Sequence, residues 1–149
     1  MSRRAATERL TYSLVDSLFA ISGATMAQVS ELMGTLGLTT ALADALWQLD
    51  PEQPAPSMRE LAVRLRCDPS TLTFVADRLA KKQLLKREVE PGNRRIKRLV
   101  LTAKGAAVRA KLTAAMTRSS PLARLSPAEQ RQLLALLTRA RALVPRPRR

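Results

Sequence analysis

The segment from Ser57 to Thr102 constrains the fold of this chain most, because it joins two short helical patterns to a hairpin signal. The first helical pattern opens with Ser57 and, three residues later, Glu60, which is the spacing of a capping box. The second opens with Asp68 and Pro69, a favoured N-cap followed by a proline at the first helical position. Two short helices separated by so tight a turn predict a helix-turn-helix.

The second helix of this pair has two chemically distinct faces. Its apolar residues recur at helical spacing and are predicted to face the core: Leu72, Val75, Ala76 and Leu79. The outward face then carries small polar, aromatic and charged side chains: Ser70, Thr71, Thr73, Phe74, Asp77, Arg78 and Lys81. A second helix that presents small polar and basic groups is typical of a helix-turn-helix.

A hairpin is predicted after the second helix, with arms at residues 84–89 and 96–101. The turn between them contains Pro91, which presets φ, and Gly92 and Asn93, which accept positive φ. Four basic residues cluster at and beside the tip: Arg94, Arg95, Lys97 and Arg98. A hairpin of this kind, a wing, could insert these cations into a neighbouring groove.

The positive charge is concentrated in the second half of the chain. The formal net charge is +14, and residues 78–111 alone carry 12 basic and 2 acidic side chains, a net charge of +10. A solvated surface without a partner would intermix the two signs more evenly. This distribution indicates a polyanionic partner.

The composition excludes several chemistries. The chain has no histidine, which excludes imidazole metal sites and Ser–His or Cys–His nucleophile pairs. Its single cysteine cannot form an intrachain disulfide, which fits a reducing cytoplasm. No apolar run approaches the roughly 20 residues of a membrane span, and the first residues lack a signal-peptide core. We therefore expect no cofactor, no metal, no membrane association and no enzymatic activity, and a cytoplasmic location.

Further helical patterns flank the central segment, at residues 7–33, 39–49, 102–118 and 126–143, with unstructured basic ends at residues 1–6 and beyond 143. The helix at 7–33 carries one stripe of Leu10, Leu14, Leu18 and Ile21 beside a second of Phe19, Met26 and Met33. This helix and the leucine-rich one at 126–143 are too apolar to be covered by a small domain, which suggests a partner chain. We therefore expect one intertwined domain with three parts. These are an N-terminal dimerisation helix at residues 1–36, the winged helix-turn-helix at 37–102, and C-terminal dimerisation helices with a basic tail at 103–149.

The central segment resembles the MarR family of bacterial winged helix-turn-helix regulators, over roughly residues 36–105. The most specific element is the family's wing signature, Asp-x-Arg followed after five residues by Leu-Thr. Here it reads Asn93-Arg94-Arg95, then IKRLV, then Leu101-Thr102. The chain departs from the family at Asn93, where Asp is usual, at Phe74, where relatives carry a polar or basic residue, and at Arg66, where Gly is frequent.

The resemblance implies a mainly α fold with a small β-hairpin, and a homodimer in which the first and last two helices intertwine. It implies a sequence-specific regulator, a repressor by expectation, that binds a pseudo-palindromic double-stranded operator. The outward face of the second helix would approach bases in the major groove, with Ser70, Thr71, Thr73 and Phe74 nearest. The phosphates of the DNA would mostly be met by Arg78, Lys81, Lys86 and Arg98, while Arg94 and Arg95 would enter the minor groove. Lys97, beside the tip of the wing, is a further expected DNA-binding residue.

Relatives often bind small aromatic anions between the dimerisation helices and the DNA-binding lobe. The resemblance therefore extends the expectation to an aromatic or anionic effector that releases the protein from DNA, with Phe19, Met26 and Trp47 as lining residues. The simpler interpretation is that these three residues pack in the protein interior. Likewise, Cys67 is more simply a core residue than a redox sensor. Two other functions stay open: non-specific binding to nucleic acid, and docking of an acidic protein partner.

Overall fold

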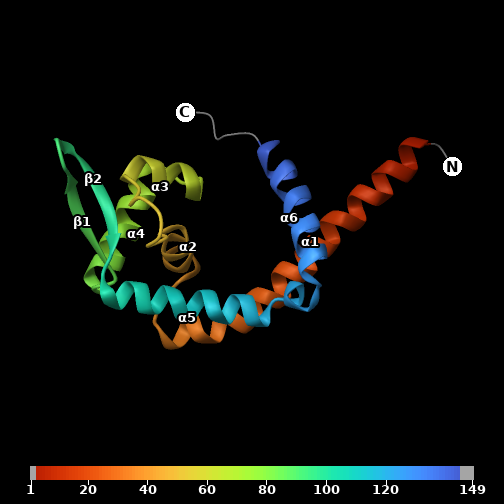
Figure 1. The fold of residues 1–149 in the computed structure, drawn as a ribbon, viewed down its shortest axis with the longest axis horizontal. Coiled ribbons are helices and arrows are strands. Elements are labelled where there is room, and N and C mark those ends of the chain that lie inside the picture. The colour runs from red at the N-terminus through yellow and green to blue at the C-terminus, as the bar shows by residue number, and fades with distance from the viewer. Residues whose placement is uncertain (1–2, 145–149) are drawn as a thin grey trace. The chain divides into compact units, whose positions relative to one another are not determined.

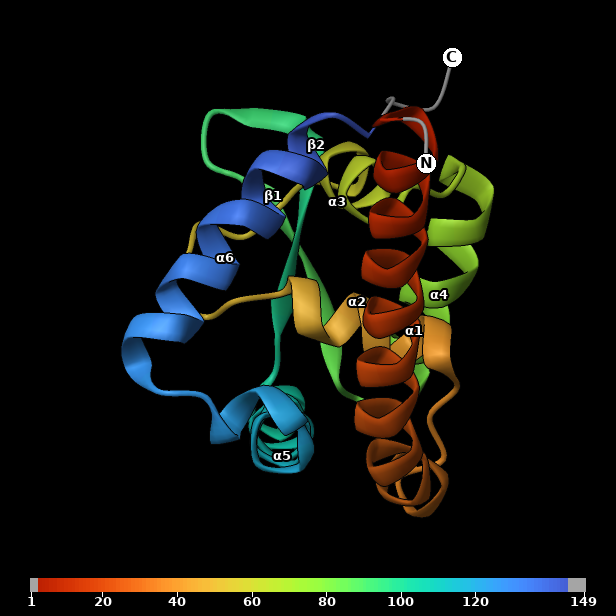
Figure 2. The same ribbon diagram turned by 90° about the vertical axis from the view of Figure 1, so that its right-hand side faces the viewer.

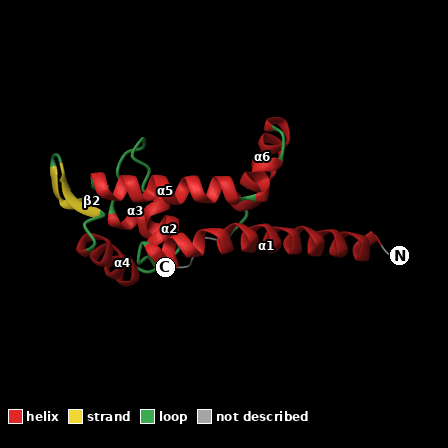
Figure 3. Cartoon of the chain, turned by 90° about the horizontal axis from the view of Figure 1, so that it is seen from below, coloured by secondary structure: helices red, strands yellow, loops and turns green. Residues whose placement is uncertain are grey.

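Helices dominate the described part of the chain, residues 3–144 of a computed structural model, and two strands form one antiparallel hairpin (Figure 1, Figure 3). The elements in chain order are α1 (Arg3–Thr35), α2 (Thr40–Gln48), α3 (Met58–Leu65), α4 (Pro69–Lys81), β1 (Leu85–Glu90), β2 (Asn93–Leu101), α5 (Ala103–Ser119), the 3-10 helix η1 (Pro121–Arg124) and α6 (Pro127–Ala142). This architecture confirms the predicted winged helix-turn-helix. Within residues 3–144, no helix is long and apolar enough to cross a membrane.

The described residues divide into two units, one formed by the chain up to Glu31 with Ala115–Val144, the other by Leu32–Ala114. In the second unit α2, α3 and α4 pack on one another, while α4 contacts β1 and α3 contacts β2 (Figure 2). Its core is formed by fully buried leucines: Leu46, Leu61, Leu72, Leu79, Leu99 and Leu112. The predicted inward face of α4 is confirmed, since Leu72, Val75, Ala76 and Leu79 are all buried.

The predicted starts of α3, α4 and α6 are confirmed, because each depends on side chains a few residues apart. The Ser57 hydroxyl accepts the Glu60 N–H at 3.2 Å, and the Glu60 carboxylate accepts the Ser57 N–H at 2.7 Å. The same box at Ser126 and Glu129 begins α6. Arg66, at the turn of the helix-turn-helix, has φ of 53°, the left-handed conformation that explains why glycine suits this position.

The hairpin differs from its prediction at the turn. The return strand β2 begins at Asn93 rather than Ile96, so Pro91 and Gly92 alone form the loop, and Gly92 has φ of 83°. Glu90 pairs with Asn93, and the register shifts between Val89 and Glu90. Arg94 and Arg95 are therefore strand residues that follow the loop, not residues of the loop itself.

Helix α1 also begins earlier than predicted, at Arg3, so residues 3–6 are helical and not an unstructured arm. The predicted disordered tail, apart from Val144, lies outside the described residues, as do residues 1–2. Gly23 lies inside the continuous helix α1, and nothing lies within 4 Å of the position its Cβ would take. Much of the apolar stripe of α1 is exposed in the single chain, including Leu10 (62%), Leu14 (58%) and Phe19 (73%).

Candidate nucleic-acid interface

The start of α4 is organised around the Asp68 carboxylate. It accepts the Thr71 N–H at 2.8 Å and the Thr71 hydroxyl at 2.6 Å, and a short hydrogen bond from the Ser70 hydroxyl completes the set. These bonds, that of Ser70 first, hold the pKa of Asp68 far below its ordinary value. Ser70 and Thr71 thus have exposed oxygens whose protons are already committed, and they present hydrogen-bond acceptors to a partner.

The middle of α4 combines an aromatic ring with a cation. Phe74 is 60% exposed, and the Arg78 guanidinium lies 5.0 Å from its ring centroid, a cation–π geometry. Thr73 and Lys81 are exposed beside them, and the Thr73 hydroxyl donates to the Pro69 carbonyl at 2.8 Å. The predicted outward positions on this helix are all exposed, so the structure places one polar, apolar and cationic surface along α4.

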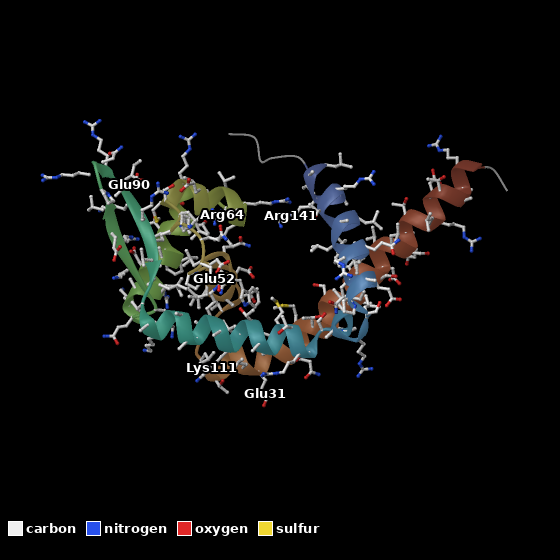
Figure 4. The ribbon with its side chains drawn as sticks, in the orientation of Figure 1. Glu31, Glu52, Arg64, Glu90, Lys111 and Arg141 are labelled. Carbon is white, nitrogen blue, oxygen red and sulfur yellow. The ribbon has the colours of Figure 1, made fainter. Side chains whose placement is uncertain are left out.

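The wing adds three exposed cations, Arg94, Arg95 and Lys97, on the strand that follows its loop. Successive side chains in a strand point to opposite faces, so Arg95 and Lys97 share one face of the hairpin and Arg94 lies on the other. The Asn93 side chain accepts the Arg95 N–H at 3.1 Å, which fixes the backbone at the start of β2. Figure 4 shows nitrogen-tipped side chains projecting at the end of the hairpin near the labelled Glu90.

Arg98, which the sequence predicts to contact DNA phosphates, has its own partners within the protein. Its guanidinium forms salt bridges with Glu60, at 2.8 Å, and with Glu90, and it also donates to the Ala55 carbonyl at 3.2 Å. With this side chain only 28% exposed, its donors are occupied within the protein. The sequence pattern did not indicate that the carboxylates of Glu60 and Glu90 converge on Arg98, and its contact with DNA stays a prediction.

The charges in this network reinforce each other. The hydrogen bonds that Arg98 donates to Glu90, and then the charges of Glu90 and Glu60, raise the pKa of Arg98 against the opposing effect of desolvation. Hydrogen bonds from Ser57, in the capping box, lower the pKa of Glu60, and Arg98 adds to that effect. Both shifts favour the charged forms of Glu60 and Arg98.

The three candidate effector-lining residues are not brought together within one unit. Phe19 and Met26 lie on the part of α1 that belongs to the first unit, whereas Trp47 lies on α2 in the second. The Trp47 indole nitrogen is buried and has no hydrogen-bond partner in the described structure. The effector site remains a prediction.

Cys67 lines a hollow of about 910 Å³ between α3 and α4, together with Met58, Val63 and Leu72. It is half-buried rather than fully in the core. Desolvation, and then the nearby charge of Asp68, raises the pKa of its thiol, which opposes formation of the reactive thiolate. Among residues 3–144, no cluster of histidine, cysteine, aspartate or glutamate could hold a metal ion.

A helix-turn-helix with a basic wing defines the chain as a winged helix-turn-helix protein. Residues 38–97 match the family model described as the MarR family, a match that runs from the residue before Thr39 into β2. The chain therefore carries a MarR-family domain and has the fold of MarR-family transcriptional regulators, a class that implies DNA binding and is generally not enzymatic.

Solved structures share this fold over most of the chain. A MarR-family transcriptional regulator from Silicibacter pomeroyi is 29% identical, with a TM-score of 0.72, and the match covers 86% of this chain and 87% of that one. The YusO protein of Bacillus subtilis shares the fold at 24% identity and a TM-score of 0.60, with 97% and 100% covered. A MepR mutant from S. aureus, solved bound to an oligodeoxyribonucleotide, is 22% identical with a TM-score of 0.61, covering 88% and 96%. A search of curated protein sequences found no match.

Proposed function

We propose that this protein is a sequence-specific, double-stranded DNA-binding regulator, most simply a repressor, that acts as a homodimer in the bacterial cytoplasm at the nucleoid. The observation that carries the proposal is the surface of α4, where Thr73, Phe74 and Arg78 are exposed in the same unit as the cationic wing. An exposed helix of this width fits the major groove, while arginines on a hairpin suit the narrower minor groove.

Each part of the surface has a distinct role in this proposal. Ser70, Thr71 and Thr73 approach base edges, and Phe74 offers an apolar contact to a thymine methyl group. Arg78, Lys81 and Lys97 neutralise phosphates, which positions the protein without specifying sequence. Arg94 and Arg95 lie on opposite faces of the wing, and the one that faces the duplex enters the minor groove.

A homodimer is supported by the apolar surface that the single chain leaves exposed. Large side chains of α1 are exposed, among them Tyr12 (73%), and α6 exposes Leu134 (65%) and Leu136 (54%). Many large apolar side chains exposed on the same helices are typical of a protein–protein interface. A two-fold dimer would place two copies of α4 on half-sites about 10 base pairs apart, so the operator should be a pseudo-palindrome.

Unbiased selection of bound sequences from a random DNA pool tests this function, repeated with aromatic carboxylates present to test effector release. We expect one enriched pseudo-palindrome, whose binding is weakened by changes in α4 and not by Arg131→Ala on α6. Enrichment of no sequence, with equal affinity for random DNA, would replace this function by non-specific nucleic-acid binding. The net charge of +14 and the sequence pI of about 11.5 favour that second candidate.

A further inference from the structure

Arg98 joins three parts of the second unit. Its Nη1 donates to the Glu60 carboxylate of α3 at 2.8 Å and to the Ala55 carbonyl at 3.2 Å. Its Nε donates to the Glu90 carboxylate at 3.2 Å, and its Nη2 donates to the same oxygen. One guanidinium thus links the wing turn, the strand β2 and the segment that leads into α3.

The backbone makes a second connection at the same place. The Leu99 N–H donates to the Pro56 carbonyl at 2.9 Å, and an isolated antiparallel bridge pairs Ser57 with Arg98. Glu60 also accepts the Ser57 N–H, so a single carboxylate both caps α3 and holds the wing arginine. The orientation of the hairpin is therefore tied to the start of the helix-turn-helix.

We propose that Arg98 is a positioning residue for DNA binding: through Glu60 and Glu90 it fixes the angle of the wing, so that the wing arginine on the DNA side reaches the minor groove while α4 lies in the major groove. This inference rests on the proposed function. Arg98 acts through its two carboxylate partners and not through a phosphate.

The chemistry of the side chain explains why arginine stands here. A guanidinium presents a rigid fork of donors that satisfies several acceptors in different directions at once, whereas a lysine ammonium is a flexible point charge. The hairpin supplies its own ladder from Leu85–Leu101 to Val89–Lys97, so the Arg98 network is not needed to form the strands. Its effect falls on the direction of the hairpin relative to α3.

The decisive measurement is the sign of the change in operator affinity on replacing Glu90 by glutamine. Removing a negative charge beside a polyanion strengthens binding if charge alone matters. The positioning role predicts the opposite, a weakening of about three- to tenfold for Glu90→Gln and for Glu60→Gln. Glutamine at position 60 keeps the capping box, so α3 still begins correctly. Glu88→Gln is the matched control, because exposed Glu88 pairs only with Lys86 among the described residues, and should leave affinity equal or stronger.

Arg98→Met separates positioning from phosphate contact. The logarithm of the DNA-binding constant falls linearly with the logarithm of salt concentration. Each phosphate contact that is lost makes this line shallower by about 0.9. We expect Arg98→Met to weaken binding by about tenfold with an unchanged slope, and Arg98→Lys to restore it only in part. If the salt dependence of Arg98→Met became as shallow as that of Lys97→Ala, the positioning role would be overturned and Arg98 would be a phosphate contact.

Amide hydrogen exchange tests the wing anchor without DNA. The Leu99 amide, which donates to Pro56, should exchange faster in Glu90→Gln and Arg98→Met than in the parent, while amides of α4 stay unchanged. Unchanged Leu99 exchange together with unchanged operator affinity in these variants refutes the inference and leaves the proposed function intact. If the parent protein selects no DNA sequence, the proposed function fails, and the role of Arg98 in DNA binding fails with it.

Discussion

Replacing Gly105 by alanine should destabilise the fold where α5 begins beneath the wing. A Cβ at this position would lie 1.9 Å from the Leu84 carbonyl oxygen and 2.8 Å from its carbon, so the backbone must separate by more than an ångström. Overpacking of this kind costs about 1–3 kcal/mol. The Leu84 carbonyl also accepts the Thr102 N–H at 3.2 Å, and losing that bond adds about 0.5–1.5 kcal/mol.

We therefore expect Gly105→Ala to lower the free energy of unfolding by about 1.5–4.5 kcal/mol, measured by urea denaturation at fixed protein concentration. Gly23→Ala is the matched control: it lies within α1 with nothing inside 4 Å of its Cβ position, and should raise stability by about 0.5–1 kcal/mol. Equal midpoints for Gly105→Ala and the parent would refute the close approach of α5 to Leu84.

Three further predictions address the site. Arg95→Ala should cost about 1–3 kcal/mol of operator binding, measured by a salt titration in which Arg131→Ala is the control; an unchanged affinity would remove the wing from the interface. Cys67 should react slowly with a thiol reagent near neutral pH because its pKa is raised, and rapid labelling of the native protein would contradict this. Because folding lowers the pKa values of Asp68 and Glu60, the stability that these groups add is complete above their ordinary values of 3.8 and 4.5. That stability is lost as the pH falls further, so Asp68→Asn should flatten the acid limb of a urea-denaturation series; an identical acid limb would contradict it.

Elements specified by neighbouring residues could be predicted from the sequence. The capping boxes at Ser57 and Ser126 and the cap at Asp68 each need only side chains three residues apart, so their spacing identifies the helix starts. The two faces of α4 followed from helical periodicity for the same reason. The resemblance to a family added the roles of the wing arginines, which periodicity alone does not assign.

Two kinds of feature could not be predicted: contacts between distant parts of the chain, and local boundaries that the residue pattern leaves open. Glu60 and Arg98 are 38 residues apart, and nothing in the local pattern indicates that they meet. The start of β2 at Asn93 depends on pairing with Glu90 across a two-residue loop, a choice that the turn residues alone leave open. The helical start of α1 at Arg3 was hidden by a basic composition that also suits an unstructured arm.

The pairing of charges changes what the net charge of the central segment means for DNA binding. Of the 12 basic residues in 78–111, four form salt bridges with carboxylates: Lys86, Arg87, Arg98 and Arg109. The Lys86 pair is about half exposed at both partners and can exchange its carboxylate for a phosphate at little cost, whereas Arg98 is shielded and held by three acceptors. The number of phosphates neutralised should therefore fall below the number of cations on the surface. The salt dependence of binding will measure that difference, because its slope counts the contacts made and not the charge present.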